Sequence, residues 1–402
     1  MGYVFVADDF TGASDTLATL TRGGLRARLF RDVPSAEALA GIEAWGIATH
    51  ARSLGREDMA ALAGRIGAGL AAFAPDFVHV KICSTFDSSA SVGNVALLAQ
   101  GLAGALGIAD IAVLAGQPSL GRYAVFGTLF ARGPDGRVHR IDRHPVMAVH
   151  PVTPMNEADL ARHLAALGLH GLHLVGRGQA GVAFPRLYDL LDQGDVAQAG
   201  ADLAAADRPL VVLGASSVAE AWLAARPPRP RAPLPAPATT GPICAFAGSR
   251  SSLTTAQVGA AEGLARLPVS PGAMMEGGAE MHTARDWVLE RLARGQDCLI
   301  YLTSADHRAI LPADLAQKTA AFVGGLHTSA RLGGLIVAGG DTSSAIVGTL
   351  APDWLDYAGE LCPGVPILRA QVQGADLLMA LKGGQMGGAD FFPRAVAALR
   401  GA

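Results

Sequence analysis

The sequence of 402 residues contains little lysine and little asparagine. Only three of its 32 basic residues are lysines (Lys81, Lys318 and Lys382), and only two asparagines occur, Asn94 and Asn156. Such a preference for arginine and alanine is typical of a coding bias. A lysine that is present despite this bias marks a position where the planar guanidinium of arginine does not replace the compact ammonium of lysine. The lysines are therefore early candidates for chemistry.

Long apolar runs, paired cysteines and excess positive charge are also missing. No run of 18 apolar residues occurs, so we predict no transmembrane helix. The first nine residues carry two acids and no basic segment, which is unlike a signal peptide. Four cysteines stand far apart without a Cys-x-x-Cys pair, which indicates reduced thiols and a cytoplasmic protein. The net charge of −3 argues against nucleic acid or a membrane surface as a partner.

Apolar residues are abundant, at 50% of the chain against 17% charged, which excludes a disordered protein. At about 100–200 residues per domain, the length predicts two domains, or three. Six of the eleven residues 227–237 are proline, which cannot continue a helix or a central strand. We therefore predict a linker over residues 226–241, between a domain at 1–225 and a second at 242–402.

Short apolar runs alternate with helical patterns in both parts of the chain. This alternation predicts the α/β class, with a mainly parallel sheet flanked by helices in each domain. The predicted strands are Tyr3–Ala7, Trp45–Thr49, Phe77–Ile82, Ile111–Ala115, Leu172–Val175, Leu210–Leu213, Ile243–Ala247, Leu299–Leu302 and Leu335–Ala338. Helical patterns include Gly12–Arg22, Ala256–Arg266 and His282–Arg294. Ligands bind beyond the carboxyl ends of such strands, so the residues after each run are the first candidates for a ligand site.

Acidic residues crowd the end of the first predicted strand. Asp8, Asp9 and Asp15 lie within a segment that opens a helix. A helix cap accounts for one acid there, but not for two adjacent ones. These carboxylates suit the binding of sugar hydroxyls, or one of them acts as a base. The residues alone leave open which one does so.

A second polar segment, residues 80–94, follows the third predicted strand. It carries Lys81, a run of hydroxyls that includes Ser84, and Asn94. Burying a lysine at a strand end is costly unless it faces an anion, although a lysine snorkelling at the sheet rim is the alternative. Cys83 is a weaker candidate for a nucleophile, because no histidine lies near it in sequence.

Two glycine-rich segments in the C-terminal part suit phosphate. Residues 335–345 run from a buried strand into Gly-Gly-Asp-Thr-Ser, where free backbone N–H groups and a helix dipole favour an anion. Residues 381–388 place four glycines after Lys382, a loop able to wrap a nucleotide. An ordinary strand–helix turn with an aspartate cap is the alternative for the first segment, and a flexible turn is the alternative for the second. A further polar turn covers residues 248–252.

Other patterns favour no site. Residues 176–181 read Gly-x-Gly-x-x-Gly, which is typical of a dinucleotide site. However, Pro185 would interrupt the helix that should follow, and no second strand that ends in an acidic residue comes about 20 residues later. A glycine-rich loop is therefore the preferred interpretation. The histidines lack zinc-ligand spacing. No lysine follows a glycine, which excludes a Walker A loop.

Taken together, these segments resemble the four-carbon acid sugar kinases over essentially the whole chain. The resemblance rests on residues 7–15, 81–87, 93–94, 339–343, 363–366 and the glycine run after Lys382. It implies a sugar-binding N-terminal domain, a nucleotide-binding C-terminal domain and an active site in the cleft between them. Residues 81–87 look like the branch that phosphorylates 3-oxo-tetronates. The family's usual Lys-Ser-Gly-Asn-Phe-Gly reads Lys-Gly-Gly-Gln-Met-Gly here, and residues 141–155, with two His-Pro pairs, suggest a distinct substrate group.

The resemblance also implies roles for individual residues. Asp8 or Asp9 is the implied catalytic acid–base group. The implied substrate-binding residues are Asp8, Asp9, Thr11, Arg52, Lys81, Ser84 and Asn94. The implied nucleotide-binding residues are Ser249, Ser251, Gly339, Gly340, Asp341, Thr342, Ser343 and Gly384.

ATP and Mg²⁺ are the implied cofactors and a small sugar acid the implied substrate, and a homodimer is left open. D-threonate, D-erythronate or another short sugar acid is an alternative substrate. A nicotinamide-dependent dehydrogenase and a non-catalytic sugar-acid-binding protein are the alternative functions.

Overall fold

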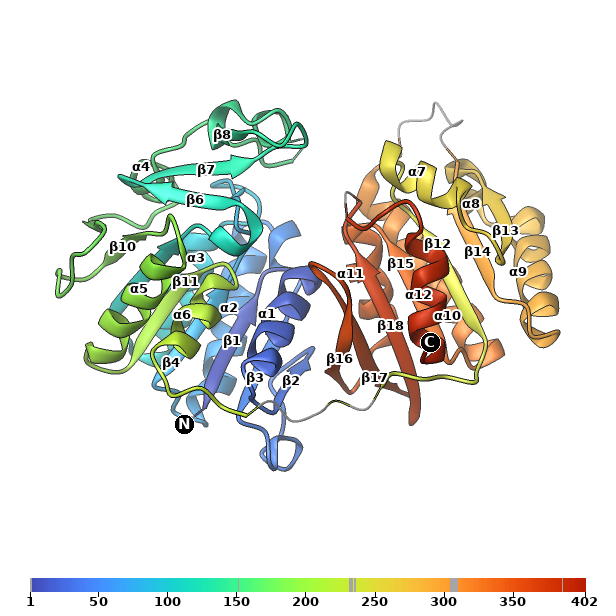
Figure 1. Cartoon of the computed structure of the whole chain (residues 1–402), viewed down its shortest axis with the longest axis horizontal. Coiled ribbons are helices and arrows are strands. Elements are labelled where there is room, and N and C mark those ends of the chain that lie inside the picture. The colour runs from blue at the N-terminus through green and yellow to red at the C-terminus, as the bar shows by residue number, and fades with distance from the viewer. Residues whose placement is uncertain (1, 151, 231–233, 235, 304–309, 385) are drawn as a thin grey trace. The chain divides into compact units, whose positions relative to one another are not determined.

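The chain divides into two compact units, Met1–Ala232 and Pro233–Ala402 (Figure 1). The computed structural model describes residues 2–150, 152–230, 234, 236–303, 310–384 and 386–402. The division falls within residues 226–241, for which a linker is predicted, and residues 231–233 and 235 of that segment lie outside the described residues. Both units alternate strands and helices, so the predicted α/β class is confirmed.

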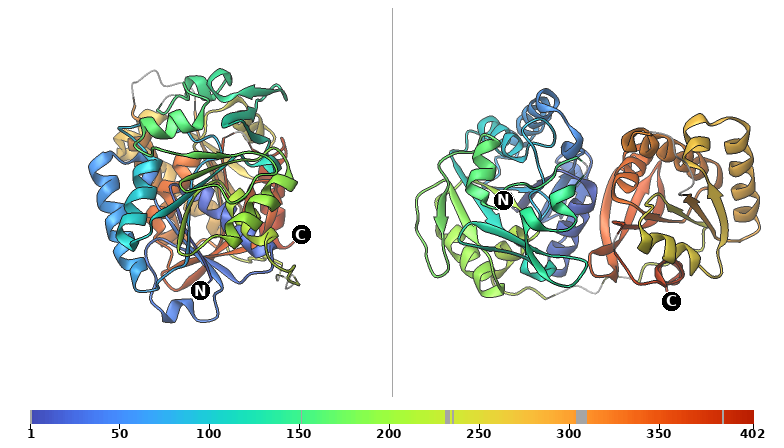
Figure 2. Two further views of the ribbon diagram at one scale, coloured as in Figure 1. Left: turned by 90° about the vertical axis from the view of Figure 1, so that its left-hand side faces the viewer. Right: turned by 90° about the horizontal axis from the view of Figure 1, so that it is seen from above.

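The first unit is built on a parallel sheet with helices on both faces (Figure 1, Figure 2). The sheet order is β2-β3-β1-β4-β11-β5-β10-β9. These strands are β1 (Tyr3–Ala7), β2 (Ala27–Phe30), β3 (Ala44–Ala48), β4 (Phe77–Lys81), β5 (Asp110–Ala115), β9 (His173–Val175), β10 (Arg186–Asp189) and β11 (Leu210–Gly214). The helices are α1 (Phe10–Arg22), α2 (Arg56–Ala71), α3 (Val95–Leu106), α4 (Leu160–Ala166), α5 (Gln193–Ala205) and α6 (Ser217–Ala224).

The order of these strands explains where a ligand would bind. From β1 the chain crosses through α1 to β2 in one direction, whereas from β4 it crosses through α3 to β5 in the other. Right-handed crossovers therefore put α1 and α3 on opposite faces. A crevice opens at the carboxyl ends of strands whose connections diverge in this way.

A second, antiparallel sheet of the first unit was not predicted. It consists of β6 (Arg122–Val125), β7 (Thr128–Arg132) and β8 (Val138–Arg140), and it lies beyond the carboxyl ends of the parallel strands (Figure 1). Short helical turns at Pro118–Leu120, Ile141–Arg143 and Met147–Val149 flank it. The backbone N–H of Ala124 donates to the carbonyl of Leu190, just after β10, at 3.0 Å. This is an ordinary hydrogen-bond length.

The second unit has a mixed sheet in the order β13-β14-β12-β15-β18-β17-β16. Pairing is parallel from β13 to β18 and antiparallel from β18 to β16. Its strands are β12 (Ile243–Ala247), β13 (Ala265–Val269), β14 (Cys298–Leu302), β15 (Gly334–Ala338), β16 (Trp354–Cys362), β17 (Val365–Val372) and β18 (Ala375–Lys382). Its helices are α7 (Ser252–Gly259), α8 (Pro271–Glu276), α9 (Gly278–Ala293), α10 (Pro312–Ala330), α11 (Gly340–Leu350) and α12 (Phe391–Arg400).

The predicted helix Ala256–Arg266 is wrong beyond residue 259. The helix α7 ends there, Gly263 adopts a positive φ of 79°, and residues 265–269 form β13. A glycine in that conformation breaks the helical path at no steric cost. Pro268 is tolerated because β13 lies at the edge of the sheet.

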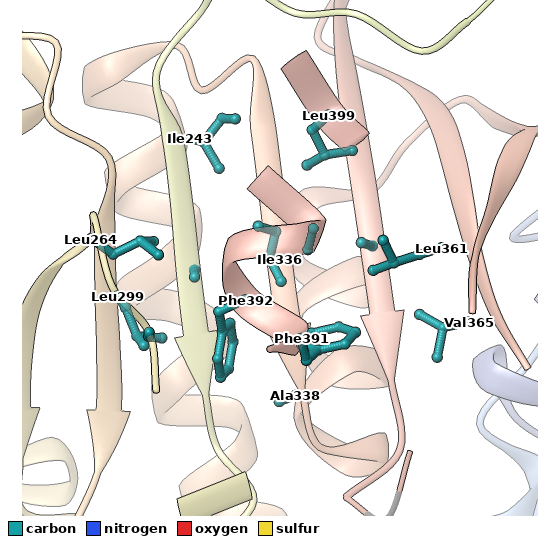
Figure 3. Packing of buried hydrophobic residues seen from close by; sticks show 14 of the residues in the cluster. Ile243, Leu264, Leu299, Ile336, Ala338, Leu361, Val365, Phe391, Phe392 and Leu399 are labelled. Atoms are coloured by element: carbon teal, nitrogen blue, oxygen red, sulfur yellow. The ribbon is translucent and has the colours of Figure 1, made fainter. Parts of the chain in front are cut away.

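The core of the second unit packs the last helix onto the sheet (Figure 3). Phe391, Phe392 and Leu399 of α12 belong to one buried cluster with Ile243 of β12 and Ile336 of β15. Phe392 is completely buried, so its replacement by alanine would cost about 3–5 kcal/mol. This packing holds the carboxyl ends of β12, β15 and β18 together.

Candidate functional site

Three neighbouring strands of the first unit end at one level and carry polar residues there. Ala7, the last residue of β1, lies opposite Ala48 of β3 and Lys81 of β4. Backbone hydrogen bonds extend this alignment, because the N–H of Asp8 donates to the carbonyl of Lys81 (2.9 Å) and that of Arg52 donates to the carbonyl of Asp8 (3.0 Å). The structure thus brings together residues predicted from three separate strand ends.

Arg52 bridges the two adjacent carboxylates. Its Nη2 lies 3.5 Å from Oδ2 of Asp8, and its Nη1 lies 3.2 Å from Oδ2 of Asp9. Burial opposes the charge of Arg52, but the two carboxylates outweigh burial and raise the pKa of Arg52 well above its usual value. Arg52 is therefore a permanent cation in this group.

Asp9 begins the helix α1. Its Oδ1 accepts a hydrogen bond of 2.6 Å from the backbone N–H of Gly12, which makes it the N-cap. Burial alone would raise the pKa of Asp9, but Arg52, Lys81 and the Gly12 N–H outweigh burial and lower that pKa. Asp9 is thus held as an anion, and the cap that the sequence suggested is present.

Asp8 has a different environment. Asp8 is only 2% exposed to solvent, and its Oδ1 is buried with no hydrogen-bond partner among the described residues. Burial raises the pKa of Asp8 to about 6, with help from Asp9 and Asp87 and against the opposing effects of Arg52 and Lys81. An unpaired buried carboxylate oxygen is costly, which points to a ligand that donates to it.

Lys81 is buried at the end of β4, where its Nζ donates to the carbonyl of Ile82 at 2.8 Å. A Cβ at Gly12 would lie 2.6 Å from this Nζ and 2.7 Å from Oδ1 of Asp9. The glycine therefore lets the ammonium approach the first turn of α1. The alternative of a solvent-exposed lysine at the sheet rim is wrong for Lys81, which is 4% exposed.

The loop after β4 carries a chain of polar contacts. Thr85 Oγ1 donates to Oδ1 of Asp87 at 2.5 Å, and Thr153 Oγ1 donates to Oδ2 of the same carboxylate at 3.4 Å. Cys83 Sγ lies 2.9 Å from Thr85 Oγ1. Burial raises the pKa of Cys83, with a further contribution from Asp87, so the thiol is a poor nucleophile.

Sequence reasoning missed Thr153. It belongs to residues 141–155, which the sequence marked only as unusual, and no local pattern links it to Asp87. The link arises because the segment that follows β8 folds back on the loop after β4.

The other predicted substrate residues surround this group less closely. Asn94 is the N-cap of α3, with Oδ1 accepting from the N–H of Leu97 (2.9 Å) and Nδ2 donating to the carbonyl of Leu167 (3.0 Å). Thr11 lies in the first turn of α1 and is half-buried. Ser84 is 8% exposed and follows β4 directly. None of the three has a side-chain hydrogen bond to Asp8, Asp9, Arg52 or Lys81 among the residues that the structure describes.

The second unit has its own polar group where β12, β15 and β18 end. Ala338 of β15 lies opposite Ala247 of β12 and Lys382 of β18. The N–H groups of Gly248 and Ser249 both donate to the carbonyl of Ala338 at 2.9 Å. The turns after β12 and β15 therefore lie side by side. From β12 the chain continues to β13 in one direction along the sheet, and from β15 it continues to β16 in the other, which is where a ligand crevice opens.

These turns have the features of a phosphate site. Gly339 has a φ of 134°, which favours glycine, and a Cβ at Gly340 would meet nothing within 4 Å. Helix α11 begins at Gly340, so its free N–H groups and dipole favour an anion. Ser343 Oγ, in the first turn, is buried and has no partner among the described residues. Asp341 is exposed and Thr342 buried in the same turn.

Ser249, Ser251 and Gly384 also meet here. Ser251 Oγ donates to the carbonyl of Gly384 at 2.7 Å and caps α7. A Cβ at Gly384 would lie 2.5 Å from Ser249 Oγ, which explains the glycine. Gln257, which the sequence did not indicate, donates from Nε2 to the carbonyls of Met386 (3.1 Å), Gly387 (3.2 Å) and Gly388 (2.8 Å). Gln385 of this loop lies outside the described residues.

Lys382 ends β18 as a fully buried ammonium. Its Nζ lies 3.2 Å from both Thr254 Oγ1 and the carbonyl of Gly383, and 5.3 Å from the centre of the Phe391 ring. It has no ion pair within residues 236–303, 310–384 and 386–402. Burial lowers the pKa of Lys382 to about 8. A buried cation without an anion fits a site completed by phosphate.

The glycine-rich segment between β9 and β10 has a structural role. The Gly-x-Gly-x-x-Gly at 176–181 lies between β9 and β10 with no helix after it, so the dinucleotide reading is wrong. The N–H of Gly181 donates to Asp202 at 2.9 Å, and Asp202 also contacts Arg186 and Tyr188. In the described part of the chain, no group of three or more His, Cys, Asp or Glu residues could hold a metal ion.

Family models cover both units. Residues 3–222 match the sugar-binding N-terminal domain, and residues 244–392 match the nucleotide-binding C-terminal domain. The chain belongs to the four-carbon acid sugar kinase family. The resemblance noted from the sequence is therefore confirmed, and the chain is an ATP-dependent kinase of a sugar acid.

Similar proteins cover the chain nearly from end to end. A 3-oxo-isoapionate kinase of Paraburkholderia graminis is 32% identical over 96% of this chain and 92% of the relative. A 3-oxo-tetronate kinase of Methylobacterium radiotolerans is 33% identical over 97% of each. The crystal structure of Haemophilus influenzae protein HI1011 has a TM-score of 0.74 at 25% identity and covers 98% of this chain and 100% of its own. Among the described residues of this kinase, no helix is both long and apolar enough to span a membrane.

Proposed function

We propose that this kinase transfers the γ-phosphoryl group of ATP to the terminal hydroxyl of a 3-oxo-tetronate, forming the 4-phosphate. Two observations support this substrate. Residues 81–87 resemble the 3-oxo-tetronate branch, and the Methylobacterium radiotolerans relative with that name is 33% identical over 97% of the chain.

The observation that carries the proposal is the pattern of buried and partly buried charges at the ends of β1, β3 and β4. Arg52 and Lys81 supply two cations for a substrate carboxylate, and Asp8 and Asp9 supply acceptors for its hydroxyls. A short acid with several hydroxyls is complementary to such a group. Thr11, Ser84 and Asn94 are proposed to add contacts from the edges, with Asn94 the least available because both its polar atoms are already bonded.

We propose that ATP lies on the second unit. Its phosphates would be held by the turn at Gly339–Ser343, by Lys382 and by the serines of the 249–251 turn, with Gly384 allowing close approach. Mg²⁺ would neutralise phosphate charge when bound, and it commonly uses phosphate oxygens and water with only one or two carboxylates. Asp341, exposed in the first turn of α11, is the carboxylate available there. A cleft between the two domains as the place of transfer stays a prediction.

A second substrate has specific support. The Paraburkholderia graminis relative, 32% identical over 96% of the chain, is named a 3-oxo-isoapionate kinase. The contact between Thr153 and Asp87 links the unusual segment 141–155 to the loop after β4, and this link supports a substrate that is branched and not linear. D-threonate and D-erythronate stay as further alternatives.

The test is a coupled assay of ADP release with each acid in turn. The panel contains 3-oxo-tetronate generated in situ by a dehydrogenase, 3-oxo-isoapionate, D-threonate and D-erythronate. We expect the highest kcat/KM with 3-oxo-tetronate. A higher value with 3-oxo-isoapionate would replace the first substrate with the second, and no ADP release with any acid would refute both. Whether the protein forms a homodimer is tested separately by its mass in solution.

A further inference from the structure

The two adjacent carboxylates of the first unit are bonded in different ways. Both oxygens of Asp9 are engaged, Oδ1 by the N–H of Gly12 at 2.6 Å and Oδ2 by Nη1 of Arg52 at 3.2 Å. Asp8 has only one engaged oxygen, Oδ2, which lies 3.5 Å from Nη2 of Arg52. Its Oδ1 is buried and unpaired among the described residues.

This difference decides which carboxylate can receive a proton. A general base must lie within hydrogen-bond reach of the proton that it takes, so it needs a free acceptor atom. Asp9 would have to release its helix cap or its ion pair to provide one. Asp8 already holds a free oxygen inside the site, and leaving that oxygen unpaired in the free enzyme is unfavourable.

We propose that Asp8 is the proton acceptor for the substrate hydroxyl, and that Asp9 is a positioning residue that fixes Arg52 and the start of α1. The proposal rests on the proposed sugar-acid kinase function and deepens it, because neither the family models nor the relatives' names distinguish these two acids.

The hydroxyl of the sugar acid loses its proton to Oδ1 of Asp8 while its oxygen forms a bond to the γ-phosphorus of ATP. The bond from that phosphorus to the β–γ bridging oxygen breaks, and the electron pair leaves with ADP. The protonated Asp8 afterwards releases its proton to water, so that one proton appears for each phosphorylated product.

The charged groups around Asp8 agree with this role. Arg52 faces it from the turn after β3, Asp9 from the N-cap of α1, Lys81 from the end of β4 and Asp87 from the loop after β4. Burial, Asp9 and Asp87 together raise the pKa of Asp8 to about 6 against the opposing effects of the two cations. A base with such a pKa is ionised at neutral pH and holds a proton better than an ordinary aspartate, which is the compromise that general-base catalysis favours.

The deciding experiment compares Asp8→Asn with Asp9→Asn in the full chain, with Asp32→Asn as the control. Asp32 lies on the surface, paired with Arg65 at 2.6 Å. The wild-type kcat should fall as pH drops through about 6, because Asp8 then becomes protonated. Asp8→Asn should lower kcat by about 10²–10⁴-fold, abolish this acid limb and leave the KM for ATP unchanged.

Asp9→Asn should behave differently. It should raise the KM for the sugar acid, because Arg52 loses a partner, but it should retain the acid limb. The limb should move to lower pH, since the charge of Asp9 contributes to the raised pKa of Asp8. Loss of the limb in Asp9→Asn together with its retention in Asp8→Asn would overturn the proposal.

Two further measurements separate catalysis from folding and from the substrate question. Asp8→Glu keeps a carboxylate and should recover part of the turnover and the acid limb, whereas a purely structural Asp8 would give a similar kcat loss in both variants. Carboxyl-carbon NMR of aspartate-labelled full-length protein should show a titration near pH 6 that disappears in Asp8→Asn. This signal needs no substrate, so inactivity toward the whole panel would refute the proposed substrate, whereas absence of the titration would refute the role of Asp8.

Discussion

At the scale of single residues, the two buried lysines of this kinase occupy different surroundings. Lys81 lies among the carboxylates of Asp8 and Asp9, whereas Lys382 is buried without any described anion. Lys318, the third lysine, lies in α10 and is exposed. The scarcity of lysine in the sequence pointed to Lys81 and Lys382, but it could not show that only one of them has a protein counterion, because side-chain packing decides that.

Replacement of Lys382 by methionine should weaken ATP binding by about tenfold or more, since a charge-assisted hydrogen bond contributes about 1.5–3 kcal/mol. The folded pKa of Lys382 lies below its ordinary value, so the wild type should lose ATP affinity as pH rises through about 8. Lys382→Met should show weak affinity with no such pH dependence. Isothermal titration of ATP at pH 6.5–9 measures both effects.

Lys318→Met is the matched control for this change. This variant makes the same lysine-to-methionine change in the helix α10. We expect the ATP affinity of the variant and its dependence on pH to equal those of the wild type. Equal affinities of wild type and Lys382→Met across the pH range would remove Lys382 from the phosphate site.

Gly12 offers a second test at this scale. A Cβ there would come within 2.6 Å of Lys81 Nζ and 2.7 Å of Asp9 Oδ1, so Gly12→Ala must displace one of them. We expect at least a tenfold loss of kcat/KM for the sugar acid and unchanged ATP affinity, measured by steady-state kinetics and titration. Gly104→Ala is the control, because its Cβ meets nothing within 4 Å in α3, and it should stabilise the protein by about 0.5–1 kcal/mol. Normal turnover in Gly12→Ala would show that the turn tolerates the displacement.

At the scale of elements, most of the parallel strands and the polar turns after them were predictable, whereas the parallel strands β2, β10 and β13 and both antiparallel parts were not. Parallel strands buried on both faces give continuous apolar runs, such as Tyr3–Ala7 and Ile243–Ala247. The strands β6–β8 are partly exposed, so they lack that signal. The strands β16 and β17, on either side of residues 363–364, were not predicted. The two ion pairs of Arg52, with Asp8 and with Asp9, were not predictable either, because they depend on the register of β1 and β3.

The helix α7 and the glycine loop after β18 should act as one element through Gln257. Gln257→Leu removes the donor to three carbonyls, at Met386, Gly387 and Gly388, while nearly preserving volume. We expect a loss of about 1–3 kcal/mol in the free energy of unfolding and weaker ATP binding, with kcat retained at saturating ATP. Urea denaturation and ATP titration measure these.

Gln100→Leu serves as the control for that variant. Gln100 also donates from Nε2 to a glycine carbonyl, Gly168 at 3.1 Å, but it makes this single bond at the surface of the first unit. Its loss should change stability by no more than about 0.5 kcal/mol and ATP affinity not at all. If Gln257→Leu matched Gln100→Leu in both measurements, the loop would not depend on α7.

At the scale of the whole molecule, each unit holds one proposed ligand group at its own diverging strand connections. The group at β1, β3 and β4 and the group at β12, β15 and β18 have separate hydrogen-bond networks. Each unit also has a core of its own. Binding of one ligand to one unit should therefore stabilise the backbone of that unit.

Hydrogen–deuterium exchange of the full chain tests this separation. ATP alone should protect peptides that cover residues 248–252 and 339–343, and the sugar acid alone should protect those that cover residues 8–12, 49–54 and 81–87. At a ligand concentration of 100 times Kd, binding opposes unfolding by about 2.7 kcal/mol, enough to slow exchange about a hundredfold wherever exchange requires opening of the liganded unit. Protection of residues 8–12 by ATP alone would mean that the two sites are coupled before the sugar acid binds, because neither network contains a residue of the other.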